Sequence, residues 1–450
     1  MRGLPSTILL VVVAAALVGY IYFVDAPSTG DEAREKVFTV DAQAISEITV
    51  TSAGETTVLG KVDDAWRLTS PVEADADESE VSSLTSQLSG LEITRIVDEN
   101  ATDLAEYGLA DPRVAVGFAA GDVRGRLLLG DVTPTTSDMY AMREGETAVF
   151  LIPAFLESTF ARSAFDLRDK RVLRVTRGDV ERVEIVEGAQ TIRFARAGEA
   201  WRLEQPYAAR GDFSTIDGLV TRLASTPMTS VVAEQVGALA PYGLDRPAFT
   251  VRLGAGSTTA ELVLGREEDG RVYARDQSRA MVFTVEPSLA GDLGRTAEEY
   301  RNKDLFDFRT FNARRAVVTR GDERIEFEKR AGEGENAEEA WHRVGGPETH
   351  TSLIEDFLAK LAGLRAESFA GTSAGTGLGA PILTVEVTFD EDRTERVSFG
   401  RSANEVFGAR ADEPGAARLD PTAFTEASNA LEAATTPATD TEARPPSGQP

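Results

Sequence analysis

The chain contains no cysteine, only two histidines and three tryptophans among its 450 residues. The absence of cysteine excludes disulfides, thiolate metal sites, a cysteine nucleophile and a lipid-modified N-terminal cysteine, so an oxidising compartment is tolerated. Basic residues are also scarce, since 74 acidic and 47 basic residues give a formal net charge of −27. A surface of this sign repels phosphate backbones and anionic headgroups, so nucleic-acid binding is not expected. The charge is typical of a soluble globular surface, with a cationic partner or loosely held divalent ions as the alternative.

Motifs for catalysis are missing or stand in the wrong context. The chain has no phosphate-binding loop, no glycine-rich dinucleotide motif after a strand and no Cys-Xaa-Xaa-Cys. Residues 371–375 match the nucleophile elbow of serine hydrolases, but that elbow needs a strand before it and a helix directly after it. Both histidines, His342 and His350, precede its serine, whereas the triad needs a later histidine. We therefore predict a flexible loop, two surface histidines, no catalytic residue and no cofactor.

Acidic clusters at residues 73–78 and 390–392 suggest calcium, but neither has the glycine and the closing glutamate of an EF-hand loop. A solvated turn with a helix start explains the first cluster, and a hairpin turn explains the second. Zinc would need three or four convergent ligands, and without cysteine the remaining ligands would be carboxylates. Arg-Gly-Asp begins at Arg177, Arg210 and Arg320, but Gly-Asp is ordinary turn chemistry. The sequence thus predicts no metal site and no adhesive loop.

One apolar run, residues 4–24, has no charged residue. At about 1.5 Å per residue a helix of this length spans roughly 31 Å, the thickness of a bilayer core. Arg2 precedes the run, and Asp25, Asp31 and Glu32 follow it. The positive-inside rule then predicts a single-pass inner-membrane protein with residues 1–3 in the cytoplasm and its bulk in the periplasm or outside the cell. The alternative is a signal peptide cleaved after Ala26.

The rest of the chain repeats at a spacing of about 134 residues, too long for a helical solenoid and suited to tandem domains. Trp66 and Trp201 lie 135 positions apart, and Tyr107-Gly108-Leu109 recurs as Tyr242-Gly243-Leu244. The third copy keeps only Gly377 and Leu378 of this triplet. Prolines and glycines follow in step: Pro112, Pro247 and Pro381, then Gly130, Gly265 and Gly400. The predicted segments are a linker at 25–33, modules at 34–167, 168–300 and 301–432, and a disordered tail at 433–450.

Each module is predicted to be α+β. Short β-branched runs such as 45–51, 56–59 and 66–69 indicate a small antiparallel meander, and four later runs indicate a second antiparallel sheet. An amphipathic helix lies between them, with an i, i+3, i+4, i+7 stripe in the second and third copies. Capping boxes are expected at Asp77 with Glu80 and at Ser352 with Glu355. A helical turn at 103–109 ends at Gly108, and helices at 153–166 and 287–301 lead into the next copy. The fold class is thus a transmembrane helix followed by three tandem repeats, each of short antiparallel sheets with one main amphipathic helix.

An Arg-Xaa-Lys element opens every copy, and with the repeated tryptophan and Tyr-Gly pairs it forms the recurring signature of the chain. We favour a structural role for this signature, as helix stop and inter-module joint. Partner contact is the alternative, since binding requires these side chains to face an open groove. The candidate residues are Arg34, Lys36, Trp66, Tyr107, Gly108, Arg168, Lys170, Trp201, Tyr242, Gly243, Arg301 and Lys303.

The order of four elements resembles the bacterial family called domain of unknown function 4340. These elements are Arg-Asp-Lys at 168–170, Trp-Xaa-Leu-Xaa-Xaa-Pro at 201–206, Tyr-Gly-Leu-Xaa-Xaa-Pro at 242–247 and Leu-Xaa-Leu-Gly at 262–265. The resemblance covers roughly residues 34–301 well and the third copy weakly. It implies one N-terminal membrane helix, a large exported part, and genes often beside ABC-type transport components, including gliding-related ones. It implies no enzymatic activity.

We therefore expect a non-enzymatic envelope protein whose modules form an extracytoplasmic arm, serving as an accessory subunit of an ABC-type transport or gliding-related complex. The alternative is an extracytoplasmic module that binds a cell-envelope glycan or small molecule between adjacent repeats. A third hypothesis is an envelope hydrolase that uses only carboxylates, because two catalytic carboxylates could stand among 74 acidic residues.

Overall fold

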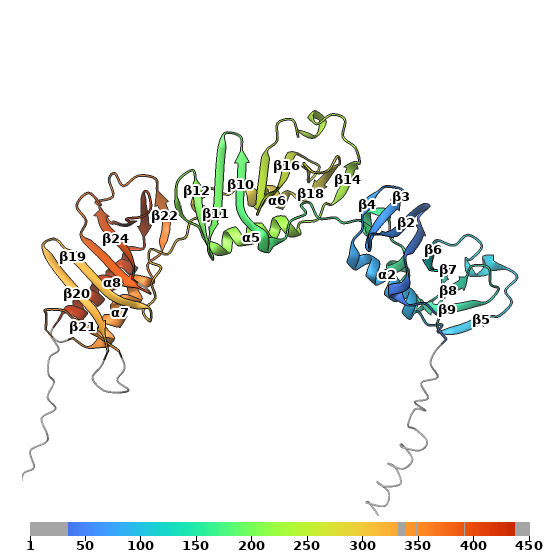
Figure 1. Ribbon diagram of the computed structural model, residues 1–450, viewed down its shortest axis with the longest axis horizontal. Coiled ribbons are helices and arrows are strands. Elements are labelled where there is room, and N and C mark those ends of the chain that lie inside the picture. Colours follow the sequence, from blue (N-terminus) through green and yellow to red (C-terminus); the bar gives the residue numbers. More distant parts are fainter. Residues whose placement is uncertain (1–34, 332–338, 348, 391, 437–450) are drawn as a thin grey trace, which may run out of the picture. The chain divides into compact units, whose positions relative to one another are not determined.

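The computed structural model describes residues 35–331, 339–347, 349–390 and 392–436. The chain divides into two compact units, Met1–Lys170 and Arg171–Pro450. The first unit contains one antiparallel sheet and the second contains two (Figure 1). We call the chain around each sheet the first, second and third module. Among the described residues no helix is long and apolar enough to cross a bilayer, and the expected membrane segment at 4–24 lies outside them, as does Arg34.

Each module is built on one continuous sheet, so the prediction of two small sheets per module is wrong. In the first module β1 pairs with β2 on one side and with β6 on the other, which joins the two meanders. The strand order is β4-β3-β2-β1-β6-β7-β8-β9-β5, and the second module repeats it. The pairing of β1 with β6 connects residues almost seventy positions apart, and local alternation carries no information about such a partner.

The strands occupy nearly every predicted run. In the first module they are β1 (Glu47–Ser52), β2 (Glu55–Val62), β3 (Ala65–Ser70), β4 (Ala74–Asp75), β5 (Arg95–Asp98), β6 (Val114–Ala120), β7 (Val123–Val132), β8 (Asp138–Arg143) and β9 (Val149–Pro153). In the second they are β10 (Val180–Glu187), β11 (Gln190–Ala197), β12 (Ala200–Gln205), β13 (Ala209–Arg210), β14 (Ser230–Ala233), β15 (Phe249–Ala255), β16 (Thr258–Glu268), β17 (Arg271–Asp276) and β18 (Val282–Val285). In the third they are β19 (Ala313–Arg320), β20 (Glu323–Arg330), β21 (Ala340–Arg343), β22 (Ala366–Ala370), β23 (Leu383–Phe389), β24 (Arg393–Ser402), β25 (Glu405–Arg410) and β26 (Ala416–Leu419).

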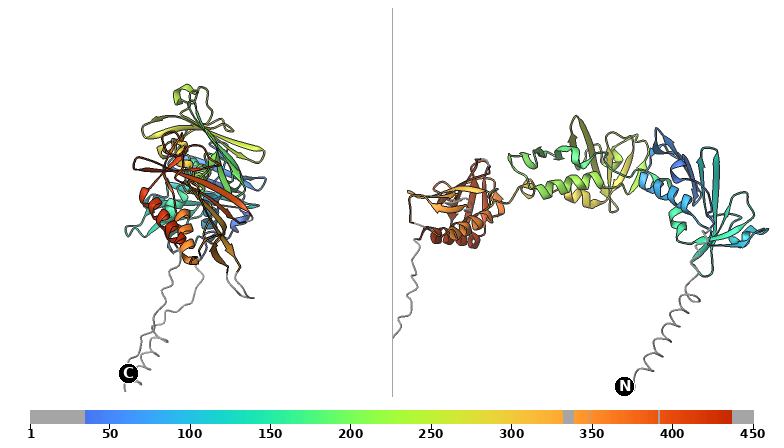
Figure 2. Two further views of the ribbon diagram at one scale, coloured as in Figure 1. Left: turned by 90° about the vertical axis from the view of Figure 1, so that its left-hand side faces the viewer. Right: turned by 60° about the horizontal axis from the view of Figure 1, so that its bottom comes forward.

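One main helix covers the same face of each sheet: α2 (Glu78–Gly90), α5 (Phe213–Ser225) and α7 (Thr351–Ala362) (Figures 1 and 2). The predicted apolar stripes are buried, so the amphipathic helices are confirmed. Asp77 caps α2 by accepting from the amides of Ser79 and Glu80. The capping box expected at Ser352 is wrong, because α7 begins at Thr351 and its N-cap is His350, which makes no side-chain capping bond.

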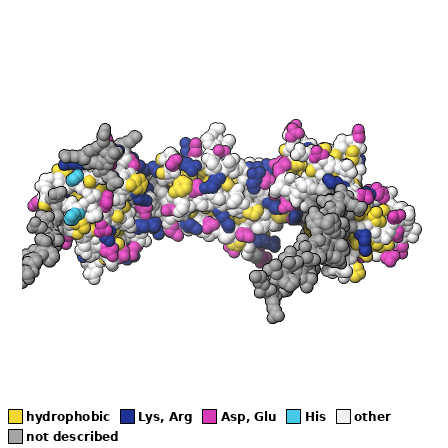
Figure 3. Space-filling model, turned by 90° about the horizontal axis from the view of Figure 1, so that it is seen from below, with side chains coloured by type: hydrophobic (Ala, Val, Ile, Leu, Met, Phe, Trp, Pro, Cys, Tyr) yellow, Lys and Arg dark blue, Asp and Glu magenta, His cyan; other side chains and the backbone are white. Residues whose placement is uncertain are grey.

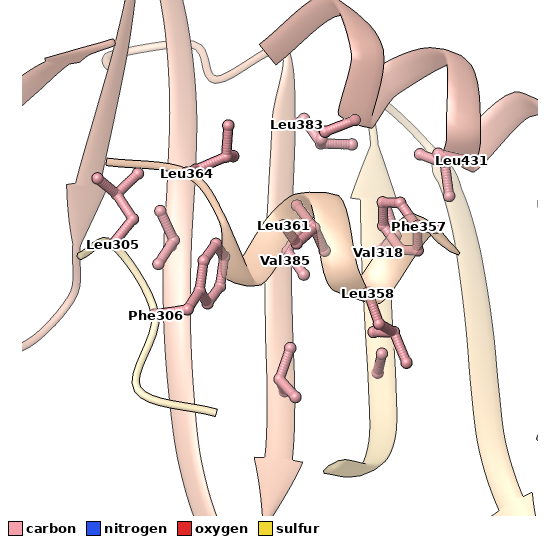
Figure 4. Packing of buried hydrophobic residues seen from close by; sticks show 14 of the residues in the cluster. Leu305, Phe306, Val318, Phe357, Leu358, Leu361, Leu364, Leu383, Val385 and Leu431 are labelled. Atoms are coloured by element: carbon pink, nitrogen blue, oxygen red, sulfur yellow. The ribbon is translucent and has the colours of Figure 1, made fainter. Parts of the chain in front are cut away.

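The third module has the most extensive aromatic core. Phe357, Leu358 and Leu361 of α7 point toward Val318 and Val385 of the sheet (Figure 4). A second helix, α8 (Pro421–Thr435), packs beside α7 and buries Leu431 and Ala434. The helix thus continues through residues 433–435, which the sequence assigned to the disordered tail, because alanines fill the face that meets the core. The remaining tail, 437–450, lies outside the described residues.

The helices expected at 153–166 and 287–301 are each split in two. The pieces are α3 (Leu156–Phe160) with α4 (Ala164–Leu167), and α6 (Pro287–Leu293) with η6 (Ala297–Tyr300). Each second piece restarts at a capping box, Ser163 with Asp166 and Thr296 with Glu299. These caps satisfy the free amides of a new helix start, so the break is encoded locally. The other short helices are η2 (Ala42–Ala44), η3 (Leu104–Tyr107), η4 (Arg177–Asp179) and η5 (Ala240–Tyr242).

We expect the protein to lose stability in alkali, because Tyr300 at the end of η6 is a buried phenol. Burial raises the pKa of its phenol to about 12, and the hydroxyl donates to the carbonyl of Asp292 at 3.0 Å. The unfolded phenol ionises near pH 10. Stability contributed by the neutral phenol is therefore complete below pH 10 and is lost as the pH rises toward 12, by about 2–3 kcal/mol. Chemical denaturation at pH 9 and pH 12 should show a smaller loss for Tyr300→Phe than for the wild type; equal losses would contradict this assignment.

Candidate interaction site

The tyrosines of the repeated Tyr-Gly-Leu triplet pack on the sheet face opposite the main helix. Tyr107 lies against Tyr140 with ring centroids 5.1 Å apart, and Tyr242 lies against Tyr273 at 5.2 Å. Each tyrosine joins a small apolar cluster in its module, the second of which includes Leu244. Both rings are partly buried. The contacts favour a packing role for the triplet.

The glycines of the signature allow the triplet to sit on the sheet. Gly108 and Gly243 end their helical turns with φ of 67° and 69°, in the left-handed region, as the sequence predicted. A Cβ placed on Gly265 would lie 2.1 Å from the carbonyl oxygen of Tyr242, and one on Gly130 would lie 2.1 Å from that of Tyr107. The repeated strand glycine is therefore the place where the backbone of the triplet touches the strand.

Replacing Tyr242 with alanine tests packing against binding. We expect a loss of about 2 kcal/mol in the free energy of unfolding, because the variant removes the ring contact with Tyr273 and leaves a void over the sheet. Thermal melting of Tyr242→Ala should therefore show a clearly lower midpoint. An unchanged midpoint together with lost partner capture would instead assign the tyrosine to binding.

The tryptophans lie inside the modules. Trp66 and Trp201 are 7% and 1% exposed, and each opens the third strand of its sheet as expected. Lys61 and Arg196 stand over their rings at 5.3 and 5.5 Å. These contacts give the tryptophans a role in closing the core.

The Arg-Xaa-Lys segment at residues 301–303 is a joint between the second and third modules. On one side Asn302 donates its amide to the carbonyl of Arg210 at 2.9 Å, and Arg301 forms a β-bridge with Gly211. On the other side the carbonyl of Lys303 accepts from the amide of Ala366 at 2.7 Å. One short segment thus pairs with both modules. Arg168 makes the corresponding bridge to Ala76 inside the first unit.

The first copy does not keep the Arg-Xaa-Lys register. The amides of Val37, Val172 and Leu305 donate to Leu91, Thr226 and Leu364 in their own modules, so these three positions are equivalent. This alignment places Glu35, not Lys36, where the other copies have Lys170 and Lys303. The ammonium of Lys36 donates to the carbonyl of Ser89 at 3.1 Å, and that of Lys170 to the carbonyl of Asp166 at 2.8 Å.

The joint is held by a buried carboxylate shared between two arginines. Glu413, in the loop between β25 and β26, accepts from Arg210 Nε at 2.7 Å and from Arg301 Nη2 at 2.8 Å. The side chains of Glu413, Arg301 and Arg210 are only 4%, 6% and 11% exposed. The Arg301 guanidinium also lies over the ring of Phe369, 3.8 Å from its centroid. Buried charges of this kind are stable only when they are paired and hydrogen-bonded.

The ionisation of the joint follows from this pairing. Burial by itself would raise the pKa of Glu413, but the charges and hydrogen bonds of Arg210 and Arg301 outweigh burial and hold the pKa below its ordinary value. Arg210 also pairs with Asp307. Nearby, Arg410 donates to Glu395 at 2.7 Å and to the carbonyl of Leu305 at 2.8 Å. The members of this network come from both the second and the third module.

Two clefts open beside this network. One, of only about 20 Å³, is lined by Arg301, Lys303 and Phe369 among others. The larger, of about 510 Å³, is lined by residues that include Trp201, Arg210 and Asp307. Lys303 of the Arg-Xaa-Lys element is exposed beside the joint, whereas Arg301 is buried in it and neither of these two clefts is lined by Tyr242.

The histidines and the acidic clusters stay apart from this site. His342 and His350 are both exposed, on one face of the third module (Figure 3). No group of three or more potential metal ligands occurs within residues 35–331, 339–347, 349–390 and 392–436. Residues 371–375 form an irregular exposed loop, and Asp390 and Asp392 flank the turn between β23 and β24. Neither cluster of acids is organised as a ligand set in the described part of the chain.

The fold defines a class of protein: tandem α+β modules, each with one antiparallel sheet covered by a main helix. The chain belongs to the family described as domain of unknown function (DUF4340), whose model matches residues 66–200 and 201–381. The resemblance read from the sequence is thereby confirmed, and each match begins at a tryptophan of the repeat.

Other comparisons add little. No curated protein matches the chain in sequence. Similar solved structures include a DNA polymerase sliding clamp from Pseudomonas aeruginosa with ligand, at 10% identity and a TM-score of 0.16, covering 86% of this chain and 93% of that one. Another is DNA polymerase III subunit beta from Borrelia burgdorferi in complex with a natural product, at 6% identity and a TM-score of 0.13, covering 86% and 93%. These TM-scores are too low to relate the folds.

Sequence reasoning missed the residues that organise the joint. Arg210 was considered only as part of an Arg-Gly-Asp adhesion motif, and Glu413 stands 203 positions further along the chain. One signal in the sequence was Arg210, which stands directly before Gly211. The first copy has Asp75 at the matching position before Ala76, so the two copies differ in charge at this position.

Proposed function

We propose that the protein is a non-enzymatic, single-pass envelope protein whose modules form an extracytoplasmic arm, and that it serves as an accessory subunit of an ABC-type transport or gliding-related complex. The observation that carries the proposal is the joint at Glu413. A carboxylate buried between two arginines makes the second and third modules a continuous structure. Such a joint favours modules that act together as one arm.

Support for the tether comes from the sequence. The apolar run at 4–24 and the acidic residues after it predict export of everything that follows. The resemblance to the family implies a membrane helix and transport-related gene neighbours, which supports the proposal.

Purification from native membranes tests the proposed function. The full chain, expressed at its native level and extracted in mild detergent, should co-purify with a permease-type membrane protein. A chain in which Phe357, a core residue of α7, is replaced by alanine serves as the folding control, because it should destabilise the third module and lose any partner held there. Repeated recovery of the wild-type chain without such a partner would contradict the proposal.

A second candidate function is binding of an envelope glycan or small molecule at the joint. The cleft of about 510 Å³ favours it, because its volume suits a small ligand and residues of two adjacent repeats line it. Thermal-shift screening against envelope sugars separates the two functions, since a ligand raises the melting temperature in a concentration-dependent way. No shift with any sugar at millimolar concentration would remove this candidate for glycans.

A further inference from the structure

The third module contacts Arg210 and Arg301 through a surface that we call the acceptor face. The acceptor face consists of Phe369 of β22, Arg410 at the end of β25, and Glu413. Phe369 stacks under the Arg301 guanidinium, and Glu413 accepts from both Arg301 and Arg210. Arg410 fixes the face to the start of its own module through the carbonyl of Leu305. The acceptor face therefore combines an apolar ring with a carboxylate, and it holds guanidinium groups.

The first module has the same arrangement at equivalent positions. Arg143 pairs with Leu127 across β7 and β8, as Arg410 pairs with Val397 across β24 and β25. Arg143 Nε donates to the carbonyl of Val37 at 2.6 Å, matching the bond from Arg410 to Leu305. Glu146 follows Arg143 by three positions, as Glu413 follows Arg410.

The apolar component is also present. Ile96 in β5 pairs with Phe150, which pairs with Ala141 of β8. Phe369 in β22 pairs with Ala417, which pairs with Gly408 of β25. Ala141 lies two residues before Arg143, and Gly408 lies two residues before Arg410. Ile96 therefore occupies the position that is equivalent to Phe369.

The two faces differ in pairing and in exposure. Glu413 pairs with Arg210 and Arg301, whereas Glu146 and Glu35 pair with Arg143 of their own face at 3.0 and 3.1 Å. Glu413 is 4% exposed, whereas Glu146 is 49% and Glu35 is 63% exposed. Ile96 and Val97 are 44% and 38% exposed. Exposed, adjacent β-branched residues on an edge strand, flanked by carboxylates, form a surface suited to a partner.

We propose that this acceptor face of the first module binds an arginine-bearing segment of a partner protein, in the way that the third module binds Arg210 and Arg301. The proposal rests on the proposed function as an interaction arm and names its contact surface. Asp98 and Glu99 follow Ile96 along the chain, and Glu35 and Glu146 share the single Arg143. These carboxylates outnumber the arginine that they surround in sequence and pairing, so the surplus negative charge complements a guanidinium group. Stacking of a guanidinium on the apolar patch adds to the ion pairs.

A second copy of this chain does not supply the required groups. In the second module the donor sequence before α5 is Arg210-Gly211-Asp212, and Asp212 is the N-cap. Before α7 of the third module the matching sequence is Glu348-Thr349-His350, with His350 at the N-cap. The third module thus lacks the arginine that an acceptor face holds. The occupant is therefore a different protein.

The experiment compares partner capture by the wild-type full chain with capture by Glu146→Arg and by Ile96→Asp, each purified from native membranes. A photo-cross-linking amino acid at Val97 identifies the contacting segment by mass spectrometry. The matched control is Glu199→Arg, a charge reversal in the exposed turn between β11 and β12. Melting temperatures of all variants show whether the first module remains folded. Because Glu146→Arg removes the ion pair with Arg143, Ile96→Asp serves as a second variant that keeps the bonds of Arg143.

We expect at least a tenfold loss of capture for Glu146→Arg and Ile96→Asp, none for Glu199→Arg, and a cross-linked partner peptide that contains arginine. Replacing that arginine with glutamate should restore capture by Glu146→Arg. Wild-type capture that both variants retain would overturn this inference while leaving the proposed function standing. Cross-links only to a second copy, or only to residues 1–34, would also overturn it. Absence of any partner from the wild type would overturn both.

Discussion

Replacing Glu413 with alanine is expected to lower the free energy of unfolding by about 3–5 kcal/mol, because the change leaves two buried guanidinium groups without their shared carboxylate. Arg210 keeps Asp307, but Arg301 loses its ion pair altogether among the described residues. At the joint the amides of Asp212 and Asn302 donate to the carbonyls of Tyr300 and Arg210. Both amides should exchange hydrogen faster in Glu413→Ala. Hydrogen exchange measured by mass spectrometry reads these amides directly.

Glu405→Ala is the matched control. Its carboxylate, in the neighbouring strand, pairs with Arg418 at 3.5 Å and is 54% exposed. Exposed ion pairs of this kind contribute about 0–1 kcal/mol, so the variant should melt like the wild type. Equal behaviour of the two variants would contradict a structural role for the joint.

The pH dependence of the joint has a definite sign. Because the folded pKa of Glu413 is lowered, its contribution is present above the unfolded pKa of about 4.3 and is lost as the pH falls through the folded value. The difference in stability between wild type and Glu413→Gln should therefore shrink in acid below pH 4. A difference that stays constant down to pH 2 would mean that the carboxylate titrates as in the unfolded chain.

Replacing Gly265 with alanine is expected to cost at least about 3 kcal/mol, the upper range for overpacking. The new methyl group would lie 2.1 Å from the carbonyl oxygen of Tyr242 and 3.2 Å from Leu244. Neither strand nor triplet backbone can retreat without breaking the helical turn that ends at Gly243. Equilibrium unfolding in urea should show the loss, with the second module unfolding first.

Gly218→Ala provides the opposite control in the same module. Gly218 lies on the exposed side of α5, and a Cβ there would meet nothing within 4 Å. Alanine in a helix interior should stabilise the module by about 0.5–1 kcal/mol. If both substitutions destabilise the chain equally, the close contact between strand and triplet is not the reason that glycine stands at position 265.

Most of the fold could be predicted from periodicity. The runs at 114–118 and 149–152 lie within β6 and β9, and the stripe of Ile354 and Phe357 is buried. Local patterns specify which face of an element is apolar. They do not specify which strand pairs with which, so the union of two meanders into one sheet was missed. The edge strand β5 was missed too, because Ile96 and Val97 are adjacent apolar residues and give no alternation of apolar and polar positions in the sequence.

The candidate site was predicted only in part. The Arg-Xaa-Lys element at 301–303 was identified as a joint or a contact, and the structure places it at a joint with open clefts beside it. The equivalence of Lys36 with Lys170 was off by one residue, because a match of two residue types outweighed the spacing of 135 positions between Trp66 and Trp201. Glu413 could not be found from sequence, since an ion pair across 203 positions leaves no local trace.

The central claim is that these modules stand outside the cytoplasmic membrane, where a partner meets them. The lack of cysteine gives this claim a direct measurement. Ser373→Cys introduces one thiol in the exposed loop before β23, and a membrane-impermeant maleimide is applied to spheroplasts with and without lysis. We expect full labelling without lysis, with the labelled chain retained in carbonate-washed membranes. Labelling only after lysis would contradict it.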